Sequence, residues 1–394
     1  MGDTMPKNDG LSKANKAKQD EFYTQYVDIQ KEVNAYLEYN PDVFKGKTIL
    51  LPCDDPEWSN FTKFFAQNFE RFGLKKLIST SYANDKKTDV IVQLSLFESE
   101  SPQFDKTKTN SHGKIFILDS DDNHSGKIDI NDLKWEYLDG DGDFRSDEVK
   151  QLRDSADIIV TNPPFSLFRE FMNWVMEANK EFLIIGNINA VTYKEIFPLI
   201  KDNLVWLGES IHSGDREFRV PNSYPLNASG TRIDENGNKY IRVKGVRWFT
   251  NIDHGRRHQP MQLMTMEDNL KYSKHKDIIS NGYRKYDNYK AIDVSYSDSI
   301  PSNYSGIMGV PITFVDKYNP EQFSILGMAA GNSKATGFYY NVPYIPHPND
   351  RGGCGVINGE RVYARFLIQY TEMWKNKYKD IFCKEENNEN NIEN

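Results

Sequence analysis

Residues 45–80 read KGKTILLPCDDPEWSNFTKFFAQNFERFGLKKLIST. The first part, Lys45–Pro52, is a short apolar run between turn-forming residues, which is typical of a buried strand. Phenylalanines then recur along one stripe of Ser59–Gly73, which predicts a helix that ends at Gly73. Lys76–Thr80 predicts the next strand. Strand, helix and strand in this order form a βαβ unit, so we expect a parallel sheet covered by helices.

The same alternation continues on both sides of this stretch. A helical pattern covers Asp20–Leu37, and the segments Asp157–Thr161, Leu167–Ala178 and Phe182–Gly186 predict a strand, a helix and a strand. Together they indicate an open α/β sheet, and ligands of such sheets bind at the carboxyl ends of the strands. From about Asp215 onward the alternation is lost, which predicts a second domain of mixed α+β type.

Composition excludes several classes of protein. The 394 residues suggest about two domains, and 23 Phe, 22 Tyr and 6 Trp argue against global disorder. No apolar run approaches the roughly 18 residues of a membrane span, and Met1–Asp20 is too polar for a secretory signal. Three distant cysteines support neither a disulfide framework nor a zinc site. We therefore expect an intracellular, cytoplasmic protein without a membrane partner.

Charge is distributed unevenly along the chain. The net charge is −8, yet Lys239–Lys290 carries twelve Lys or Arg against five Asp or Glu. Phosphate attraction is local, because salt screens it beyond about 10 Å. The basic segment is therefore either a surface for nucleic acid or a solvated face without a partner, and charge alone does not decide between the two.

The most informative motif is Asn162-Pro163-Pro164-Phe165, directly after the strand predicted at Asp157–Thr161. Two prolines hold a rigid turn and donate no hydrogen bonds, so carbonyl acceptors face outward. Asn162 adds a side-chain carbonyl and Phe165 a flat apolar ring. Two acceptors beside a stacking surface match an exocyclic amine on a planar ring. The alternative is a proline-stiffened loop with a core phenylalanine.

Residues Asn162–Ser166 resemble the catalytic motif of S-adenosylmethionine-dependent DNA adenine-N6 methyltransferases. Further blocks are similar to the EcoRI-type branch of these enzymes, and the resemblance runs from about residue 20 to about 370. These blocks are Asp20–Tyr26, Cys53–Phe61, Gly73–Ile78, Gly142–Ser146, Thr161–Phe168, Gly186–Pro198 and Gly245–Asp253. The resemblance implies a Rossmann-like methyltransferase sheet, followed by a mixed α+β C-terminal recognition domain.

The resemblance also divides the chain. It implies a flexible basic arm over 1–20 and a methyltransferase catalytic domain over 21–252, with a variable insertion at about 100–135. A DNA target-recognition domain over 253–382 and a disordered polar tail over 383–394 follow.

Catalytic roles follow from the resemblance together with the chemistry of the motif. The target adenine leaves the duplex, because its N6 atom is unreachable inside the stack. We expect the Asn162 side-chain oxygen and the Pro163 backbone oxygen to accept the two N6 hydrogens, and Phe165 to stack on the base beside Pro164. The methyl donor is S-adenosylmethionine, and no metal is required.

Cofactor residues are expected in three segments. Phe22, Tyr23 and Thr24 resemble the N-terminal motif that approaches the methionine end, and Asp143 with Phe144 resembles the motif that holds the adenine of the cofactor. Asp54 and Asp55 follow the first strand, where such enzymes carry a glycine-rich loop. No glycine occurs between Leu51 and Phe72, so Ser59 or Asn60 would take over the close approach. The alternative is an acidic turn that caps the helix from Ser59, and no residue is assigned to the ribose.

A competing signal lies in Asp121–Asp132, where Asp121, Asn123, Ser125 and Asp132 fall in the register of a calcium-binding EF-hand loop. Polar insertions of this composition are commonly plain turns, so we expect no metal here. The residues expected to contact DNA are basic: Arg247, Arg256, Arg257, Lys271, Lys274, Arg284 and Lys285.

We conclude from the sequence that the chain is a site-specific DNA adenine-N6 methyltransferase that binds double-stranded DNA. The rivals are an RNA or protein-glutamine methyltransferase with the same Asn-Pro-Pro-aromatic loop, and a catalytically silent DNA-binding or calcium-binding module. The sequence reveals neither the recognition site nor the oligomeric state, nor whether a cognate restriction endonuclease accompanies the enzyme.

Overall fold

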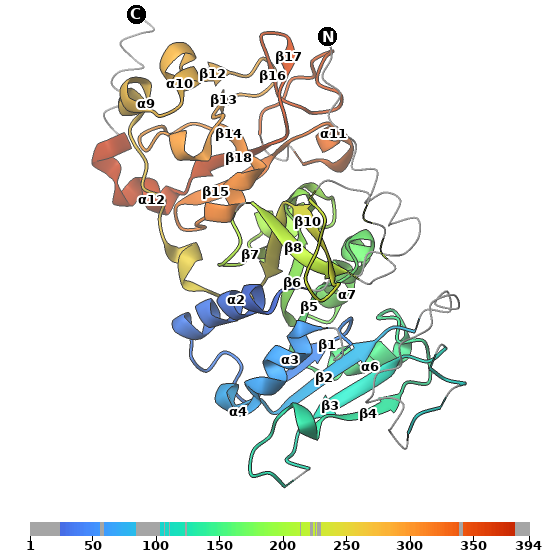
Figure 1. Ribbon diagram of the computed structural model, residues 1–394. Coiled ribbons are helices and arrows are strands. Elements are labelled where there is room, and N and C mark those ends of the chain that lie inside the picture. The colour runs from blue at the N-terminus through green and yellow to red at the C-terminus, as the bar shows by residue number, and fades with distance from the viewer. Residues whose placement is uncertain are drawn as a thin grey trace, which may run out of the picture. The chain divides into compact units, whose positions relative to one another are not determined.

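A computed structural model describes residues 24–55, 59–83, 103–105, 107–109, 111–122, 124–212, 214–220, 224, 226, 230–338 and 342–382. These residues form two compact units (Figure 1), one within Met1–Asn187 and Leu207–His254 and the other within Ile188–Trp206 and Gly255–Asn394. The arm expected over 1–20 and the tail expected over 383–394 lie outside the described residues. The segment Ile188–Trp206, which we assigned to the catalytic domain, belongs to the second unit.

The first unit is built on an eight-stranded sheet with the strand order β4-β3-β2-β1-β5-β6-β11-β7. The four strands β2, β1, β5 and β6 run parallel to one another, whereas β3, β4 and β11 join antiparallel. The strands are β1 (Thr48–Leu51), β2 (Lys76–Ser81), β3 (Lys114–Leu118), β4 (Lys134–Tyr137), β5 (Ile158–Thr161), β6 (Glu181–Asn187), β7 (Trp206–Leu207) and β11 (Val246–Thr250). This confirms the predicted α/β class with a large central sheet.

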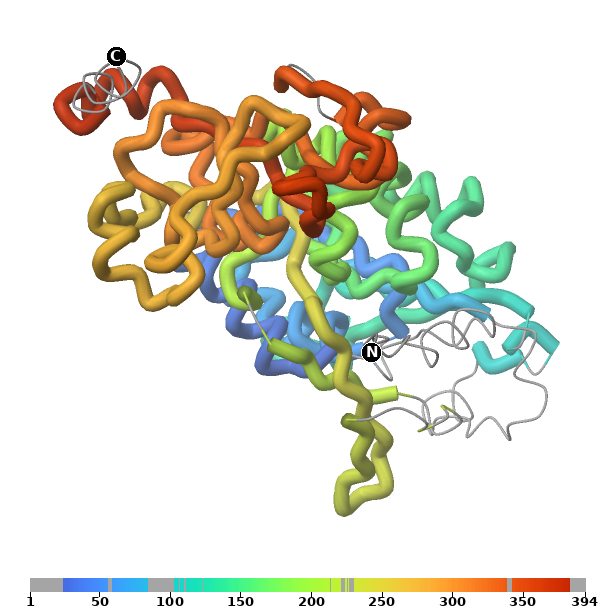
Figure 2. The backbone as a smooth tube through the Cα atoms, turned by 90° about the horizontal axis from the view of Figure 1, so that it is seen from above, coloured from blue at the N-terminus to red at the C-terminus, as the bar shows by residue number. Residues whose placement is uncertain are grey.

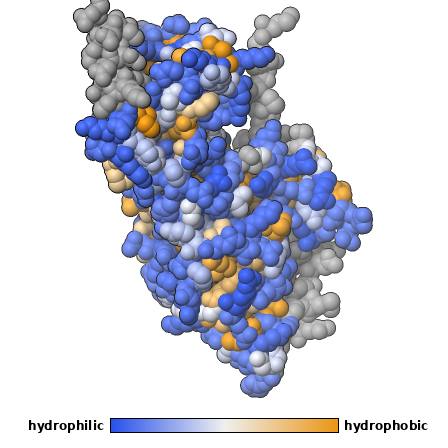
Figure 3. Space-filling model, turned by 90° about the vertical axis from the view of Figure 1, so that its left-hand side faces the viewer, coloured by the Kyte–Doolittle hydropathy of each residue, from blue (hydrophilic) through white to orange (hydrophobic). Residues whose placement is uncertain are grey.

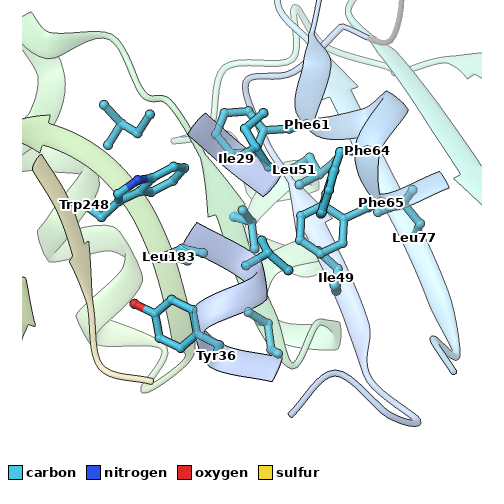
Figure 4. Close-up of a cluster of buried hydrophobic side chains, with 14 of the residues drawn as sticks. Ile29, Tyr36, Ile49, Leu51, Phe61, Phe64, Phe65, Leu77, Leu183 and Trp248 are labelled. Carbon is cyan, nitrogen blue, oxygen red and sulfur yellow. The ribbon is translucent and has the colours of Figure 1, made fainter. Parts of the chain in front are cut away.

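Helices cover both faces of this sheet. Ile49, Leu51 and Leu77 alternate with residues of the opposite face and pack in one aromatic-rich cluster with α2 (Tyr26–Tyr39) and α3 (Asn60–Gln67), as Figure 4 shows. The other face meets α6 (Asp147–Ser155) and α7 (Phe168–Glu177). At Gly186 of β6, an added Cβ would lie 2.5 Å from the Phe168 ring, so glycine permits the close packing of α7.

Strand order determines where the sheet can bind a ligand. From β1 the chain continues to β2, which pairs with β1 on one side. On its other side β1 pairs with β5, so the strand order reverses between β1 and β5. In open α/β sheets the crevice at such a reversal of strand order is where ligands bind. The sequences that follow these two strands are Pro52–Asp55 and Asn162–Phe165.

Three features differ from the sequence-based expectation. The helix predicted over Ser59–Gly73 is broken at Asn68 into α3 and α4 (Phe69–Phe72), and the Asn68 side chain donates to the Phe64 carbonyl at 2.8 Å. The region of the variable insertion at about 100–135 contains β3 and the start of β4, which extend the central sheet. Helix α6 was not predicted, because only Val149 and Arg153 of its nine residues are buried and its sequence is strongly polar.

A small antiparallel sheet also belongs to the first unit. Its strand order is β8-β10-β9, with β8 at Asp215–Val220, β9 at Arg232–Ile233 and β10 at Lys239–Lys244. Phe218 and Val220 of β8, with Ile241 and Val243 of β10, are buried in the same cluster as α2 and α3. Figure 2 shows the β9–β10 hairpin projecting away from the strands of the central sheet.

The second unit has a five-stranded mixed sheet with the order β12-β13-β14-β18-β15, and a two-stranded sheet β16-β17. Its helices are α8 (Phe197–Lys201), α9 (Met266–Tyr272), α10 (Lys276–Asn281), α11 (Ser333–Thr336) and α12 (Glu372–Lys377). Its strands are β12 (Arg284–Lys285), β13 (Ile292–Asp293), β14 (Met308–Pro311), β15 (Phe323–Ala329), β16 (Val356–Ile357), β17 (Glu360–Arg361) and β18 (Arg365–Tyr370).

The face drawn in Figure 3 is mostly hydrophilic, with apolar side chains in small groups. Among the described residues, no helix combines the length and the apolar character needed to cross a bilayer.

Candidate active site

The Asn162–Phe165 corner continues directly from β5. Pro163 is buried, whereas Asn162, Pro164 and Phe165 are partly exposed. The backbone turns at Pro164 into the 3-10 helix Phe165–Leu167, and the Leu167 amide donates to the Pro164 carbonyl at 2.9 Å. The motif therefore forms a rigid, half-buried turn at the carboxyl end of a central strand, with the Asn162 Oδ1 atom shielded and Phe165 packed against the core of the first unit.

Thr24 joins this corner to the start of α3. Its side-chain hydroxyl accepts a hydrogen bond from Asn162 Nδ2 at 3.3 Å, and its backbone carbonyl accepts from Asn60 Nδ2 at 2.7 Å. Thr24 itself is buried. Three of the predicted site residues, from three distant parts of the sequence, thus form one hydrogen-bonded group. Phe22 and Tyr23 lie outside the described residues.

Asp54 lies between the same two loops. Its Oδ1 accepts from the Ser59 hydroxyl and its Oδ2 from the Thr161 hydroxyl, both at 2.6 Å. Burial raises the pKa of this carboxyl to about 7, although the two hydroxyl donors act in the opposite direction. Asp54 therefore connects the loop after β1 to the last residue of β5, one position before Asn162.

The side-chain hydroxyl groups of Thr62, Ser79 and Thr80 donate hydrogen bonds to the loop that follows β1. The Asp54 carbonyl accepts from the Thr62 hydroxyl at 3.2 Å and also from the Ser79 hydroxyl. The Asp54 amide donates to the Thr80 carbonyl at 3.0 Å, and the Thr80 hydroxyl donates to the Pro52 carbonyl at 3.0 Å. These hydrogen bonds fix the conformation of the loop after β1, which contains no glycine.

Ser59 has two roles. It is the N-cap of α3, since its hydroxyl oxygen accepts from the Phe61 amide at 3.1 Å, and the same hydroxyl donates to Asp54. The cap of α3 is thus Ser59 itself rather than a carboxylate of the acidic turn, and Asp54 bonds to the capping hydroxyl. Asp55 also contributes to the start of the helix, because its carbonyl accepts from the Ser59 amide at 2.7 Å.

The segment Gly142–Phe144 lies against the end of β2. The Ala83 amide donates to the Asp141 carbonyl at 2.8 Å, and a Cβ on Gly142 would overlap the Ser81 carbonyl oxygen. Both carboxylate oxygens of Asp143 accept from Arg145, at 2.6 and 2.9 Å. The predicted adenine-binding segment thus adjoins the same edge of the sheet as Asp54.

Phe144 is buried, with its ring centroid 5.1 Å from that of Phe171 and 5.7 Å from that of Trp174, both on α7. Little of the Phe144 ring is therefore left for the expected contact with a cofactor.

Two residues near the corner were missed by the sequence analysis. Thr161 donates a hydrogen bond to Asp54. The feature of the sequence that could have identified it is a hydroxyl residue at the end of an otherwise apolar strand. Phe218 of β8 contacts Phe165 edge to face, with a centroid distance of 6.4 Å. No local signal identified Phe218, because β8 and the corner are far apart in the sequence.

Comparison with known proteins identifies the family. A family model described as "Adenine-specific methyltransferase EcoRI" matches residues 10–371, a range that includes every described residue of this site. The chain belongs to this family.

Three type II methyltransferases illustrate the relationship between this EcoRI-type methyltransferase and known proteins. M.EcoRI of Escherichia coli is 42% identical over 321 residues, which cover 82% of this chain and 89% of that protein. M.MpnI of Mycoplasma pneumoniae is 33% identical over 361 residues, with 91% and 97% covered. M.MgeORF184P of Mycoplasma genitalium is 34% identical over 361 residues, with 91% and 98% covered. No solved structure matches the chain.

The residues that we expected to contact DNA differ in exposure. Arg247 is buried on β11 of this EcoRI-type methyltransferase, and its guanidinium donates to the Val246 and His212 carbonyls at 2.8 and 2.6 Å. This placement fits direct contact with a phosphate poorly. Arg256 is half-buried, and the Arg257 guanidinium lies 3.5 Å from the Trp206 ring centroid.

Four of the expected DNA-contacting residues are exposed. They all lie in the second unit, and they are Lys271, Lys274, Arg284 and Lys285. Lys274 forms an ion pair with Asp298 at 2.7 Å.

The candidate calcium loop uses its carboxylates internally. Asp121 accepts from the Ser125 and Gly126 amides at 3.0 and 2.8 Å, and Asp132 accepts from the Asp129 amide at 2.9 Å. Asn123 lies outside the described residues. Within the described part of the chain, no three His, Cys, Asp or Glu side chains are grouped so that they could hold a metal ion.

Proposed function

We propose that this EcoRI-type methyltransferase transfers the methyl group of S-adenosylmethionine to N6 of an adenine that has left duplex DNA. Membership of the family makes the chain a site-specific, adenine-specific DNA methyltransferase. The observation that carries the finer proposal is the hydrogen-bonded group that joins Asn162 through Thr24 to Asn60, at the reversal of strand order between β1 and β5.

The residues at this edge of the sheet fit S-adenosylmethionine, and we interpret the first unit as a Rossmann-like methyltransferase domain. Asp55 offers a carboxylate suited to an amino group of the cofactor, and Thr24 lies beside the catalytic corner. Asp143 adjoins the same edge of the sheet, and its carboxylate is held in place there by Arg145. Asp54 supports this region through Ser59 and Thr161, since both of its oxygens already accept hydrogen bonds. When bound, S-adenosylmethionine supplies an electrophilic methyl group on a sulfonium.

The corner activates and positions the base. In our proposal, Asn162 Oδ1 and the Pro163 carbonyl accept the two N6 hydrogens, which increases the electron density available on nitrogen. Phe165 stacks on the base, a contact that elsewhere contributes about 1–3 kcal/mol. Its own position is supported by Phe218. Most of the rate enhancement then comes from orientation rather than from a covalent intermediate.

Recognition of the target sequence is assigned to the second unit, where the exposed Lys271, Lys274, Arg284 and Lys285 lie. Lysines and arginines neutralise phosphates, and arginine also reads guanine in the major groove. Because the relatives are named type II methyltransferases, we include a cognate restriction endonuclease among the proposed partners.

The decisive experiment compares the wild type with Asn162→Ala. Each protein is incubated with tritiated S-adenosylmethionine and with duplex DNA, RNA or protein, and the labelled product is then identified by nucleoside analysis. The expected product is N6-methyladenine in DNA from the wild type, reduced at least about 10³-fold in the variant, because both acceptor and geometry are lost. Calorimetry should give the two proteins similar affinity for the cofactor. Label in RNA or protein alone, or full activity of Asn162→Ala, would contradict the proposal.

A further inference from the structure

The small sheet β8-β10-β9 has two chemically different faces. Residues alternate between the faces of a strand, and Phe218, Val220, Ile241 and Val243 of the inner face are buried in the core of the first unit. The residues of β8 and β10 that alternate with these four belong to the outer face. This face is therefore anchored by an apolar layer to the same cluster as α2 and α3.

The outer face is rich in cations. The cross-strand partners on this face are Arg219 with Tyr240, Glu217 with Arg242, and Asp215 with Lys244. Arg232 of the edge strand β9 lies opposite Tyr240 and has its guanidinium 4.0 Å from the centre of that ring. Arg232, Arg242 and Lys244 are all exposed.

The Glu217 carboxylate on this face is paired with an arginine. Glu217 accepts from Arg232 in a bidentate pair at 2.8 and 2.5 Å, and this pairing lowers the pKa of the Glu217 carboxyl. Beyond that pair, the outer face carries Arg219, Arg242 and Lys244 against Asp215 and Asp234, whose carboxylate accepts from the Tyr240 hydroxyl at 3.1 Å. The face is thus net positive, although the whole chain has a charge of −8.

The strand that carries this charged face contacts the catalytic corner through its other, inner face. Phe218 on the inner face contacts Phe165 of the corner with a centroid distance of 6.4 Å, and Arg219 is the next residue along the same strand. An adenine that reaches the corner stays attached to its own strand, since base flipping is a rotation about the backbone. The phosphates that flank the target therefore lie within a few nucleotides of the corner that β8 contacts.

We propose that the outer face of the β8-β10-β9 sheet, centred on Arg242 and Lys244, binds the sugar-phosphate backbone of duplex DNA beside the extruded adenine. This inference rests on the proposed function and adds a contact surface in the catalytic unit to the residues of the second unit. Arg242 and Lys244 lie two residues apart, about 7 Å along the strand. They can therefore contact separate phosphates, and Tyr240 with Arg232 extends the surface.

The test uses the full chain and mixed-sequence duplex DNA as the probe. The test variant carries both Arg242→Gln and Lys244→Gln and is called the hairpin variant. Glutamine removes the positive charge but does not place a carboxylate opposite Glu217. The matched control is Lys45→Gln with Lys75→Gln, which removes two exposed lysines before the amino ends of β1 and β2. Each protein is titrated with DNA over a range of salt concentrations, and its affinity for S-adenosylmethionine is measured separately.

For the hairpin variant we expect a Kd for DNA about tenfold higher than for the wild type, and a slope of log K against log salt that is shallower by about 2. Cofactor affinity should not change, and the control should match the wild type. Arg242→Lys with Lys244→Arg keeps both charges and should restore binding. An unchanged Kd and slope in the hairpin variant, or an equal loss in the control, would overturn the inference. A wild type that neither binds nor methylates DNA would instead refute the proposed function.

Discussion

At the scale of single residues, Asp54 shows how a buried carboxyl can organise two loops. Its oxygens accept from Ser59 at the start of α3 and from Thr161 at the end of β5. Burial raises its pKa from 3.8 to about 7. Over the range between these values, the folded protein retains a proton that the unfolded chain releases, so raising the pH through this range destabilises the fold.

Replacing Asp54 by Asn should remove this dependence on pH. Between about pH 4 and pH 7, the free energy of unfolding of the wild type should fall relative to that of Asp54→Asn by up to roughly 4 kcal/mol, since each pKa unit corresponds to about 1.4 kcal/mol. Urea denaturation at several pH values measures the difference between the two proteins. Parallel curves would show that Asp54 ionises as an ordinary carboxyl does.

Thr161 should position the catalytic corner rather than touch the substrate. Thr161→Val removes the donor to Asp54 one residue before Asn162, and the loop can then shift. We expect kcat to fall about 10- to 100-fold, because small displacements of reacting groups are costly, while the KM for the cofactor changes little. Thr161→Ser keeps the hydroxyl and should retain most of the activity. Equal losses in both variants would contradict this role.

At the scale of elements, glycines decide how closely loops approach the ends of strands. Gly142 has φ +80° and Gly126 has φ +89°, and both would strain a residue with a side chain. They differ in their surroundings. A Cβ on Gly142 would overlap the Ser81 carbonyl, whereas nothing lies within 4 Å of a Cβ on Gly126.

Gly142→Ala should therefore cost more than Gly126→Ala. The latter pays only the conformational penalty of about 1–2 kcal/mol, but the former must also displace the loop that carries Asp143. We expect Gly142→Ala to lower Tm further and to weaken S-adenosylmethionine binding, measured by calorimetry, whereas Gly126→Ala should bind the cofactor normally. Equal cofactor affinity in the two variants would argue against a cofactor role for this loop.

Hydrophobic pattern identified some elements and missed others for a physical reason. Strands β1, β5 and β6 have near-continuous apolar sequences because both faces are covered, and these were predicted from the sequence. At the edge of the sheet, β3 and β4 are only partly buried and include Lys114 and Lys134. Residues 115–118 of β3 are an apolar run, but the place of the two strands at the edge depends on pairing of β3 with β2 and of β4 with β3, and these tertiary contacts are not recorded in a local pattern.

At the scale of the whole molecule, the chain returns to each unit after leaving it. The second unit includes Ile188–Trp206, although the rest of it begins at Gly255. Phe197 of α8 explains this membership, because its ring centroid lies 4.7 Å from that of Phe338 and 5.5 Å from that of Phe366. A boundary drawn along the sequence alone could not include this segment.

Phe197→Ala should accordingly destabilise the second unit by about 3–5 kcal/mol, the usual cost of removing a buried aromatic ring. The matched control is Leu204→Ala in the same segment, where the side chain is 52% exposed and a change within about 0.5 kcal/mol is expected. Scanning calorimetry of the full chain measures both. Similar effects of the two substitutions would mean that this segment contributes no core to the second unit.

The sequence by itself determined the α/β class, the family and the corner Asn162–Phe165, because these depend on apolar runs and on a motif of adjacent residues. Only the tertiary structure decided that Thr24, Asn60 and Asn162 share hydrogen bonds, that Asp54 joins Ser59 to Thr161, and that Phe218 supports Phe165. The physical reason is that a local pattern records which residues are buried, whereas hydrogen bonds and ring contacts between distant segments exist only after the sheet has brought the ends of its strands together.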